Sequence, residues 1–410
     1  MPGAVQFVLA PQLTVATLGA IVAGIALGTI SGLTPGIHVN TFALGLAAAA
    51  PVIPGPPRLV GAAMLAAGTT HTFLDVVPAM ALGVPDPAMA ASALPSHRLV
   101  IAGRGREALR LSALGSGLAV AFAVPLALPV TLGMTRLYPL VRAHLSLVLG
   151  VVALALIATE RGWRARIGGA VAMAASGALG LVVLGQSADG LLSVGSLLMP
   201  LFAGLFGAPV LIESIGGSGV PPQDDATVAL GPSSIGSIAL VGTVAGAIVG
   251  YVPGVTAAIA ASGALAVLSG SGPRSFVVAT SGVNTATAVF ALFALVALGT
   301  PRTGVLVAFD STGAPLALGL LVGSVSMGAT AGFVLVPMLG DRYLALVGRL
   351  DPTRLAVTVL CVLVGLSGLF AGPIGIAACT AATAIGLVPA RFGARRANLM
   401  GVLLVPLALQ

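Results

Sequence analysis

Residues 24–37 read Gly-Ile-Ala-Leu-Gly-Thr-Ile-Ser-Gly-Leu-Thr-Pro-Gly-Ile, and residues 242–255 read Gly-Thr-Val-Ala-Gly-Ala-Ile-Val-Gly-Tyr-Val-Pro-Gly-Val. In both stretches three glycines recur four residues apart and the stretch ends on Pro-Gly. The second stretch begins 218 positions after the first. Glycines at this spacing line one helix face and let another backbone approach closely. Each half of the chain is therefore expected to contain a glycine-faced helix that stops at Pro-Gly.

The composition around these stretches is that of a membrane protein. Of 410 residues, 58% are hydrophobic and only 7% are charged, whereas a soluble domain carries about 25% charged residues. The apolar runs are long and do not alternate with polar residues, which excludes the short alternating strands of a β-barrel. We therefore expect an all-α integral membrane protein, a multi-pass protein of the cell membrane whose surroundings are the lipid bilayer.

A helix that crosses the bilayer needs about 20 apolar residues. The stretches that approach this length are 12–32, 59–80, 108–132, 137–158, 167–185, 191–212, 233–252, 275–298, 313–339, 353–370, 372–389 and 397–409. Shorter apolar pieces at 37–52, 86–101 and 255–269 follow breaks and are expected to be half-helices or re-entrant segments. The sequence thus predicts about 10–12 transmembrane helices, some of them broken at Pro-Gly.

The charge pattern excludes nucleic acid as a partner. The net charge is +7, but all the basic residues are arginines and they form short clusters between apolar runs. This distribution is typical of the cytoplasmic loops of membrane proteins. Cys361 and Cys379 lie in apolar runs, and the four histidines lack metal-binding spacing. We expect no metal and no cofactor.

A second motif supports an internal repeat. Residues 81–85 read Ala-Leu-Gly-Val-Pro, and residues 297–301, which lie 216 positions later, read Ala-Leu-Gly-Thr-Pro. We expect two transmembrane repeats of inverted topology. The predicted boundaries are 10–190 for the first repeat, 213–234 for a polar linker and 235–400 for the second repeat.

The paired breaks predict a binding site. Proline ends or breaks a helix, and the segment that follows begins with free N–H groups and the positive end of a helix dipole. Broken helices at matching positions of two halves are the best sequence indication of a transporter's substrate site. An anion is expected between the two Pro-Gly loops. The candidate substrate-binding residues are Thr34, Pro35, Gly36, His38, Asn40, Thr41, Thr70, His71, Pro253, Gly254, Thr256, Asn284 and Thr285.

Two ionisable residues are candidates for ion coupling. His71 and Asp75 are four positions apart, so in a helix they share one face. Ionisable side chains within the membrane are functional candidates, and these two could bind or relay a proton. No catalytic motif and no nucleotide-binding loop stand out, which favours a secondary transporter over an enzyme.

These motifs resemble the large membrane subunit, or permease, of the tripartite tricarboxylate transporters, particularly its shorter archaeal relatives. The resemblance rests on Gly32-Leu-Thr-Pro-Gly-Ile-His-Val-Asn40, Gly83-Val-Pro-Asp-Pro87, Leu94-Pro-Ser-His-Arg98, Gly103-Arg-Gly-Arg-Glu-Ala108, Ile385-Gly-Leu-Val-Pro389 and Arg395-Arg-Ala-Asn-Leu-Met-Gly401. It implies a permease for small carboxylates, driven by an ion gradient. It also implies two partners, a small membrane subunit and a periplasmic solute-binding protein. The chain departs from the family pattern at Ile37-His38-Val39-Asn40, where Gly, Pro and Thr are more usual.

The expected function is a secondary transporter permease that moves a small anionic carboxylate by ion-coupled alternating access, with H⁺ or Na⁺ as the coupling ion. The alternative is a translocase for a polyprenyl-phosphate-type lipid anion, since such carriers also have paired Pro-Gly breaks. That alternative would favour arginines in the cavity, such as Arg98 or Arg302. A membrane scaffold or enzyme is the third hypothesis, and a homodimer is one assembly left open.

Overall fold

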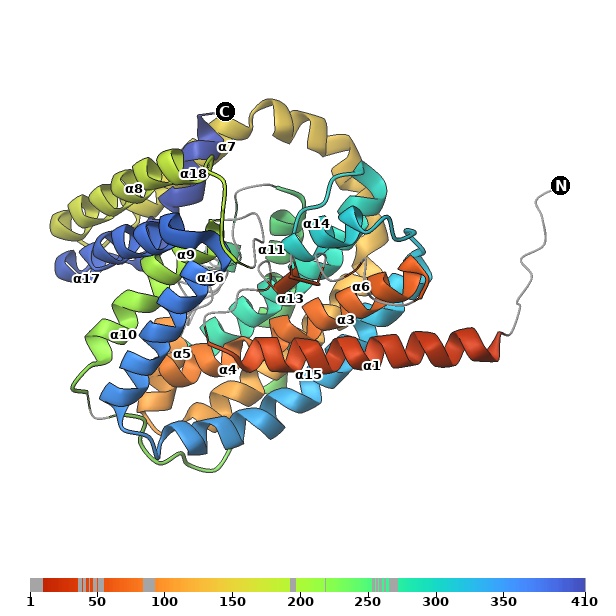
Figure 1. The fold of residues 1–410 in the computed structure, drawn as a ribbon, viewed down its shortest axis with the longest axis horizontal. Helices are drawn as coiled ribbons and strands as arrows, with labels where there is room; N and C mark the ends of the chain where they lie inside the picture. Colours follow the sequence, from red (N-terminus) through yellow and green to blue (C-terminus); the bar gives the residue numbers. More distant parts are fainter. Residues whose placement is uncertain are drawn as a thin grey trace.

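The computed structural model describes residues 10–35, 55–83, 93–191, 197–217, 219–252 and 272–409, with isolated short pieces between 39 and 50 and between 255 and 264 (Figure 1). These described residues form helices and loops, with no strand among them. Within them, eight helices are long and apolar enough to cross a membrane, and three shorter apolar helices accompany them. The chain is an all-α, multi-pass integral membrane protein.

The elements before residue 215 are α1 (Pro11–Leu33), α3 (Pro57–Leu74), α4 (Val76–Leu82), α5 (Ala93–Ile101), α6 (Gly105–Ala143), α7 (Leu145–Ala158), α8 (Trp163–Val183), α9 (Leu198–Phe202), the π-helical turn η3 (Ala203–Gly207) and α10 (Ala208–Ser214). Those that follow are α11 (Pro232–Tyr251), α13 (Pro273–Leu298), α14 (Gly304–Ser311), α15 (Leu318–Val347), α16 (Pro352–Gly386), α17 (Val388–Phe392), the 3₁₀ turn η4 (Arg396–Met400) and α18 (Gly401–Ala408).

Both glycine-faced helices end where the sequence predicts. Helix α1 stops at Leu33 and α11 stops at Tyr251, each two residues before its proline. The residue that precedes the proline is extended in both cases, with ψ 113° at Thr34 and 112° at Val252. The proline ring disfavours the helical conformation of the residue before it. The prediction that Pro-Gly ends these helices is confirmed.

The next span also recurs in both halves. Pro57–Leu82 and Pro273–Leu298 are each 26 residues long and begin on proline. Each ends on a glycine in the left-handed conformation, with φ 68° at Gly83 and 63° at Gly299. The first span is interrupted after Leu74, because Pro78 has no N–H to donate to the Leu74 carbonyl. The second span is a continuous helix.

The glycine faces explain why these helices pair. Helix α1 packs on α3 and α11 packs on α13, and most of these glycines meet the partner's backbone. A Cβ atom added at any of them would crowd the partner helix. The pairs are Gly24 with Ala63, Gly28 with Ala67, Gly32 with His71, Gly242 with Ala279, Gly246 with Val283 and Gly250 with Phe290. The same two-helix unit thus occurs in each half, which supports the predicted repeats; their inversion and boundaries stay predictions.

Each two-helix unit packs on a long helix of the other half. Helix α3 lies against α15, where the backbone of Ala66 faces Gly328, and α13 lies against α6, where the backbone of Val278 faces Gly115. The halves are therefore interlocked. We call α1, α3–α6, α11 and α13–α15 the first bundle.

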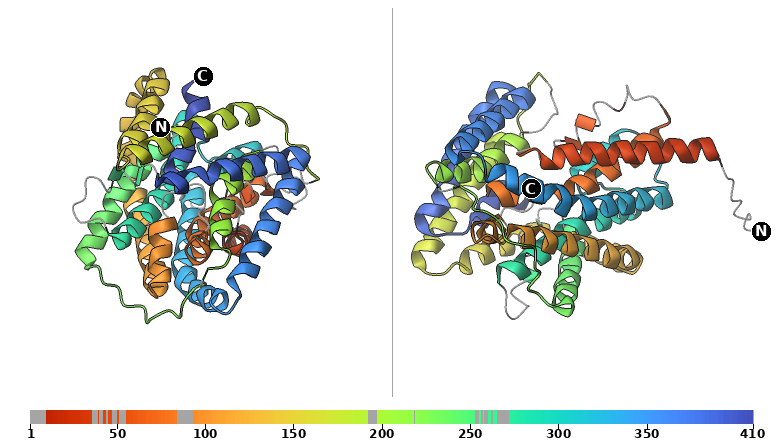
Figure 2. Two further views of the ribbon diagram at one scale, coloured as in Figure 1. Left: turned by 90° about the vertical axis from the view of Figure 1, so that its left-hand side faces the viewer. Right: turned by 90° about the horizontal axis from the view of Figure 1, so that it is seen from below.

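The remaining helices form a second bundle, α7–α10 and α16–α18 with η3 and η4, in which α8 packs on α18 and α16 packs on α9, η3 and α10. Figure 1 shows it on the left, and the right panel of Figure 2 shows the same division from below. Both halves of the chain contribute helices to each bundle.

Two expected helix boundaries have different outcomes. The break expected between residues 132 and 137 is wrong, because α6 continues to Ala143 with Pro125, Pro129 and Pro139 inside it. The break expected between the spans 353–370 and 372–389 is confirmed. It is a kink within α16 at Gly372, where φ is 63°.

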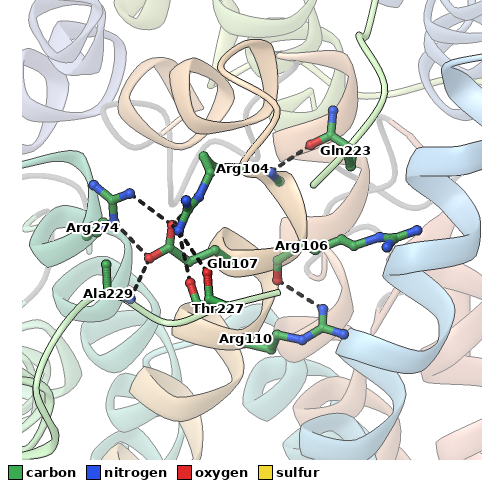
Figure 3. A network of polar contacts seen from close by, with 9 residues as sticks. Arg104, Arg106, Glu107, Arg110, Gln223, Thr227, Ala229 and Arg274 are labelled. Carbon is green, nitrogen blue, oxygen red and sulfur yellow. Dashed lines mark hydrogen bonds and ion pairs between the residues drawn. The ribbon is translucent and has the colours of Figure 1, made fainter. Parts of the chain in front are cut away.

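A buried carboxylate joins the two halves at one end of the first bundle (Figure 3). Glu107 at the start of α6 is fully buried and accepts hydrogen bonds from Arg104 and, through both of its oxygens, from Arg274 of α13. It also accepts the backbone N–H of Ala229 at 2.8 Å. Ala229 belongs to the non-helical segment 219–231 that leads from α10 to α11. Glu107 therefore fixes α6, α13 and the connection between the halves together.

Candidate functional site

A cavity of about 330 Å³ lies between the two bundles. Its walls come from α3, α11, α13, α14 and α15 of the first bundle and from α9, η4 and α18 of the second. This volume lies within the range of small-molecule sites, which is about 300–1,000 Å³. The cavity is thus large enough for a small solute and is placed where the bundles meet.

The polar wall of the cavity belongs to the first bundle. Helix α3 contributes Thr69 and Thr72, and α13 contributes Asn284 and Thr287. In both pairs the residues are three positions apart, so each pair shares a helix face. Together they give the cavity hydroxyl groups and one amide. Thr69 and Asn284 can donate hydrogen bonds to an anion, whereas Thr72 and Thr287 donate theirs to the backbone carbonyls of Gly68 and Val283.

The opposite wall is apolar and belongs to the second bundle. It consists of Phe202 from α9, Met400 from η4 and Leu403 from α18. Their side chains form no hydrogen bonds with a solute. A movement of this wall would therefore not break hydrogen bonds to the bound molecule. The polar groups stay together on the first bundle.

Residues that neighbour both Pro-Gly pairs in the sequence line the cavity. Val39, Val252 and Val255 line it, and they lie within three residues of Gly36 or Gly254 in the sequence. Thr34 and Pro35 follow the end of α1 but do not line the cavity. Seven of the predicted substrate-binding residues lie outside the described residues: Gly36, His38, Asn40, Thr41, Pro253, Gly254 and Thr256.

The other predicted residues divide between the cavity and the helix interfaces. Asn284 lines the cavity. Thr285 instead donates a hydrogen bond to Oγ of Ser116 on α6 at 2.8 Å, and Thr70 donates to the carbonyl of Gly328 on α15 at 3.2 Å. These two threonines join the halves of the chain.

His71 and Asp75 are buried within the first bundle, 0% and 7% exposed. Nδ1 of His71 hydrogen-bonds Oγ of Ser31 on α1 at 2.8 Å, and Phe42 stacks on its ring at 5.8 Å. Asp75 sits where Pro78 interrupts the span. Neither residue lines the cavity, and their proposed roles stay predictions.

Arg302 is a cavity residue that the sequence suggested only for the lipid-phosphate alternative. Arg302 lies in the loop between α13 and α14 and lines the cavity. Its guanidinium carbon is 4.8 Å from the centre of the Tyr138 ring of α6. Arg98, the other arginine of that alternative, is exposed on α5 and does not line the cavity. The only sequence signal for Arg302 is its place directly after the repeated Ala-Leu-Gly-Thr-Pro motif.

A metal centre finds no support in the part of the chain that the structure describes. No group of three or more His, Cys, Asp or Glu residues there could hold a metal ion. Cys361 is exposed and Cys379 is buried, and both are free thiols.

A model of the tripartite tricarboxylate transporter TctA family matches residues 18–401, nearly the whole chain. The chain belongs to this family. The TctA family comprises the permeases of transporters that work with a substrate-binding protein and a small membrane subunit. Membership agrees with the multi-pass helical structure and places the protein in the cell membrane.

A curated relative is similar over almost its whole length. An uncharacterized protein of Methanocaldococcus jannaschii is 27% identical over 399 residues, which cover 94% of this chain and 96% of the relative. No solved structure matches the chain. The sequence therefore shows the family.

Proposed function

We propose that this TctA-family permease moves a small carboxylate across the membrane and binds it in the cavity between the two bundles. The observation that carries the proposal is the lining of the cavity, which includes residues next to both Pro-Gly pairs in the sequence and has one polar wall. Paired helix breaks mark the substrate sites of secondary transporters. The family supplies the class of solute.

The polar wall suits an anion by its chemistry. The hydroxyl group of Thr69 and the amide of Asn284 can donate hydrogen bonds to carboxylate oxygens. The hydroxyl groups of Thr72 and Thr287 donate to the carbonyls of Gly68 and Val283 on their own helices, so they must rotate to donate to the solute. The chain segments after the two Pro-Gly breaks are proposed to add backbone N–H groups, as the N-termini of helices do at anion sites. The solute would be held by hydrogen bonds from the first bundle.

The proposed mechanism is ion-coupled alternating access. Transport requires the cavity to open to one side of the membrane and then to the other. The polar residues that line the cavity belong to the first bundle, and the second bundle contributes apolar residues only. We therefore propose that the second bundle moves against the first while the solute stays bound to the first. His71 and Asp75 lie close to Thr72 on the same span, and we propose that they bind the coupling ion, H⁺ or Na⁺.

The proposed partners are those of the family. A solute-binding protein would deliver the carboxylate and a small membrane subunit would accompany the permease. The exposed apolar residues of α1, among them Val15, Val22 and Ile30, fit contact with lipid or with such a subunit.

The test is transport by the purified permease in proteoliposomes. Labelled citrate and other small carboxylates should be taken up, and a pH or Na⁺ gradient should increase the rate of uptake. The same vesicles should be assayed for flipping of polyprenyl phosphate, because Arg302 in the cavity is a feature that the lipid alternative also favours. Lipid flipping without uptake of any carboxylate, with the family's partner proteins present, would contradict the proposed function.

A further inference from the structure

Arg302 is the one charged residue among the described residues that line the cavity. Its Nε and Nη2 atoms are buried and form no hydrogen bond with any residue of the described structure. The contact with the Tyr138 ring at 4.8 Å leaves these N–H groups unsatisfied. Buried N–H groups of a charged guanidinium are unfavourable without an acceptor, and ionisable residues inside membrane proteins are almost always paired.

Other arginines of the same protein show the usual arrangement. Arg274 directs Nε and Nη2 to the two oxygens of Glu107, at 2.8 and 3.0 Å. Arg110 pairs in two hydrogen bonds with Asp341, at 2.8 and 2.7 Å. In Arg302 the same Nε–Nη2 edge that Arg274 uses has no such carboxylate among the described residues.

We propose that Arg302 binds a carboxylate group of the transported solute and that Tyr138 is its positioning residue. The inference rests on the proposed function and names the residue that recognises the solute's charge. A planar guanidinium holds a carboxylate by two parallel hydrogen bonds. The first half of the chain has Asp86 at the position that matches Arg302 in the repeat. The guanidinium is therefore a feature of the second half alone.

The residues near Arg302 in the cavity indicate which other groups the ligand carries. Asn284 and Thr287 lie on the same cavity wall. The Asn284 amide can donate to a further carboxylate oxygen, and the Thr287 oxygen, whose proton goes to the Val283 carbonyl, can accept from a hydroxyl group of the solute. The apolar residues Phe202 and Leu403 of the second bundle line the same cavity. The site thus takes a small anion whose one carboxylate pairs with Arg302 and whose other polar groups face α13.

The experiment measures the KM of citrate uptake by the wild type, Arg302→Gln and Arg302→Lys in proteoliposomes. Arg302→Gln should raise KM by about 10- to 100-fold, because a hydrogen-bonded charge pair is lost. Arg302→Lys should lie between, since an ammonium keeps the charge without the two-pronged geometry. The control is Arg349→Gln, which removes an exposed arginine at the end of α15 and should leave KM unchanged.

A second readout separates recognition from folding. In the wild type, citrate should compete for uptake far better than a neutral amide of citrate, and Arg302→Gln should remove most of that difference. If the wild type transports citrate and Arg302→Gln has the same KM and the same preference, the inference is wrong while the proposed function stands. If Arg302→Gln does not fold, an unchanged KM in Arg302→Lys overturns the inference. A wild type that takes up no carboxylate contradicts the proposed function itself.

Discussion

At the scale of single residues, the sequence located the polar patch of α3 but not the face that meets the cavity. Thr70 and His71 were predicted to bind substrate, whereas their neighbours Thr69 and Thr72 line the cavity. Successive residues of a helix differ by about 100° in direction. In the apolar part of the span Pro57–Leu82, 89% of the residues are buried, so no exposed helix face shows which side meets the cavity.

Glu107 provides the residue-scale test of stability. Its carboxylate is fully buried and accepts hydrogen bonds from Arg104, Arg274 and Ala229. Glu107→Gln leaves two half-exposed arginines without their counter-charge, and we expect a loss of about 2 kcal/mol. The measurement is the thermal melting temperature of the protein in detergent, which should fall.

The matched control for Glu107 is Arg106→Gln. Arg106 pairs with Asp225 at 3.7 Å, and the Asp225 side chain is fully exposed. Exposed ion pairs contribute about 0–1 kcal/mol, so this variant should melt close to the wild type. Equal melting temperatures for wild type and Glu107→Gln would show that the network of Figure 3 does not hold the halves together.

At the scale of elements, small residues decide which helices pair. The three glycines of α1 face α3, and those of α11 face α13 in the same arrangement. Helix pairs in membranes depend on such close approach, because apolar side chains gain nothing by leaving lipid for one another. The glycine spacing of the opening sequence stretches therefore predicts a contact between two helices as well as a helix face.

Gly28→Ala tests this contact. An added Cβ would clash with the backbone carbonyl of Ala67, and a backbone group cannot rotate away as a side chain can. The helices must separate, at a cost of about 1–3 kcal/mol. The melting temperature should fall by several degrees. Gly19→Ala on the same helix faces open space and should be neutral or slightly stabilising. A Gly28→Ala variant as stable as Gly19→Ala would contradict the packing.

At the scale of the whole molecule, the sequence predicts the individual helices and their breaks better than it predicts how the helices pack. The membrane spans, the two helix ends at Pro-Gly and the kink at Gly372 follow from local composition. The division into two bundles depends on contacts between distant helices, such as α3 with α15 and α8 with α18. The residue pattern within one helix does not show which distant helix it will contact. For the same reason the place of Arg302 in the cavity could not be predicted.

The proposed binding of the solute between the two bundles can be tested by cysteine labelling. In a variant with Cys361→Ser and Cys379→Ala, a cysteine at Leu403 would lie on the apolar cavity wall. Citrate should change its rate of reaction with a water-soluble maleimide, by blocking the cavity or by shifting the bundles. A cysteine at Leu404, which is 0% exposed and does not line the cavity, is the control and should react slowly with or without citrate. Indifference of the Leu403 cysteine to citrate would argue against a solute between the bundles.

The central claim is that the carboxylate binds in the cavity beside the two Pro-Gly breaks, and adjacent residues of α13 test it most directly. Asn284 lines the cavity, whereas Thr285 points to Ser116 of α6. The measurement is the affinity of the purified permease for labelled citrate in Asn284→Ala and Thr285→Val. The account predicts that Asn284→Ala weakens binding by about tenfold and that Thr285→Val binds as the wild type does. Unchanged binding in Asn284→Ala together with weakened binding in Thr285→Val would contradict it.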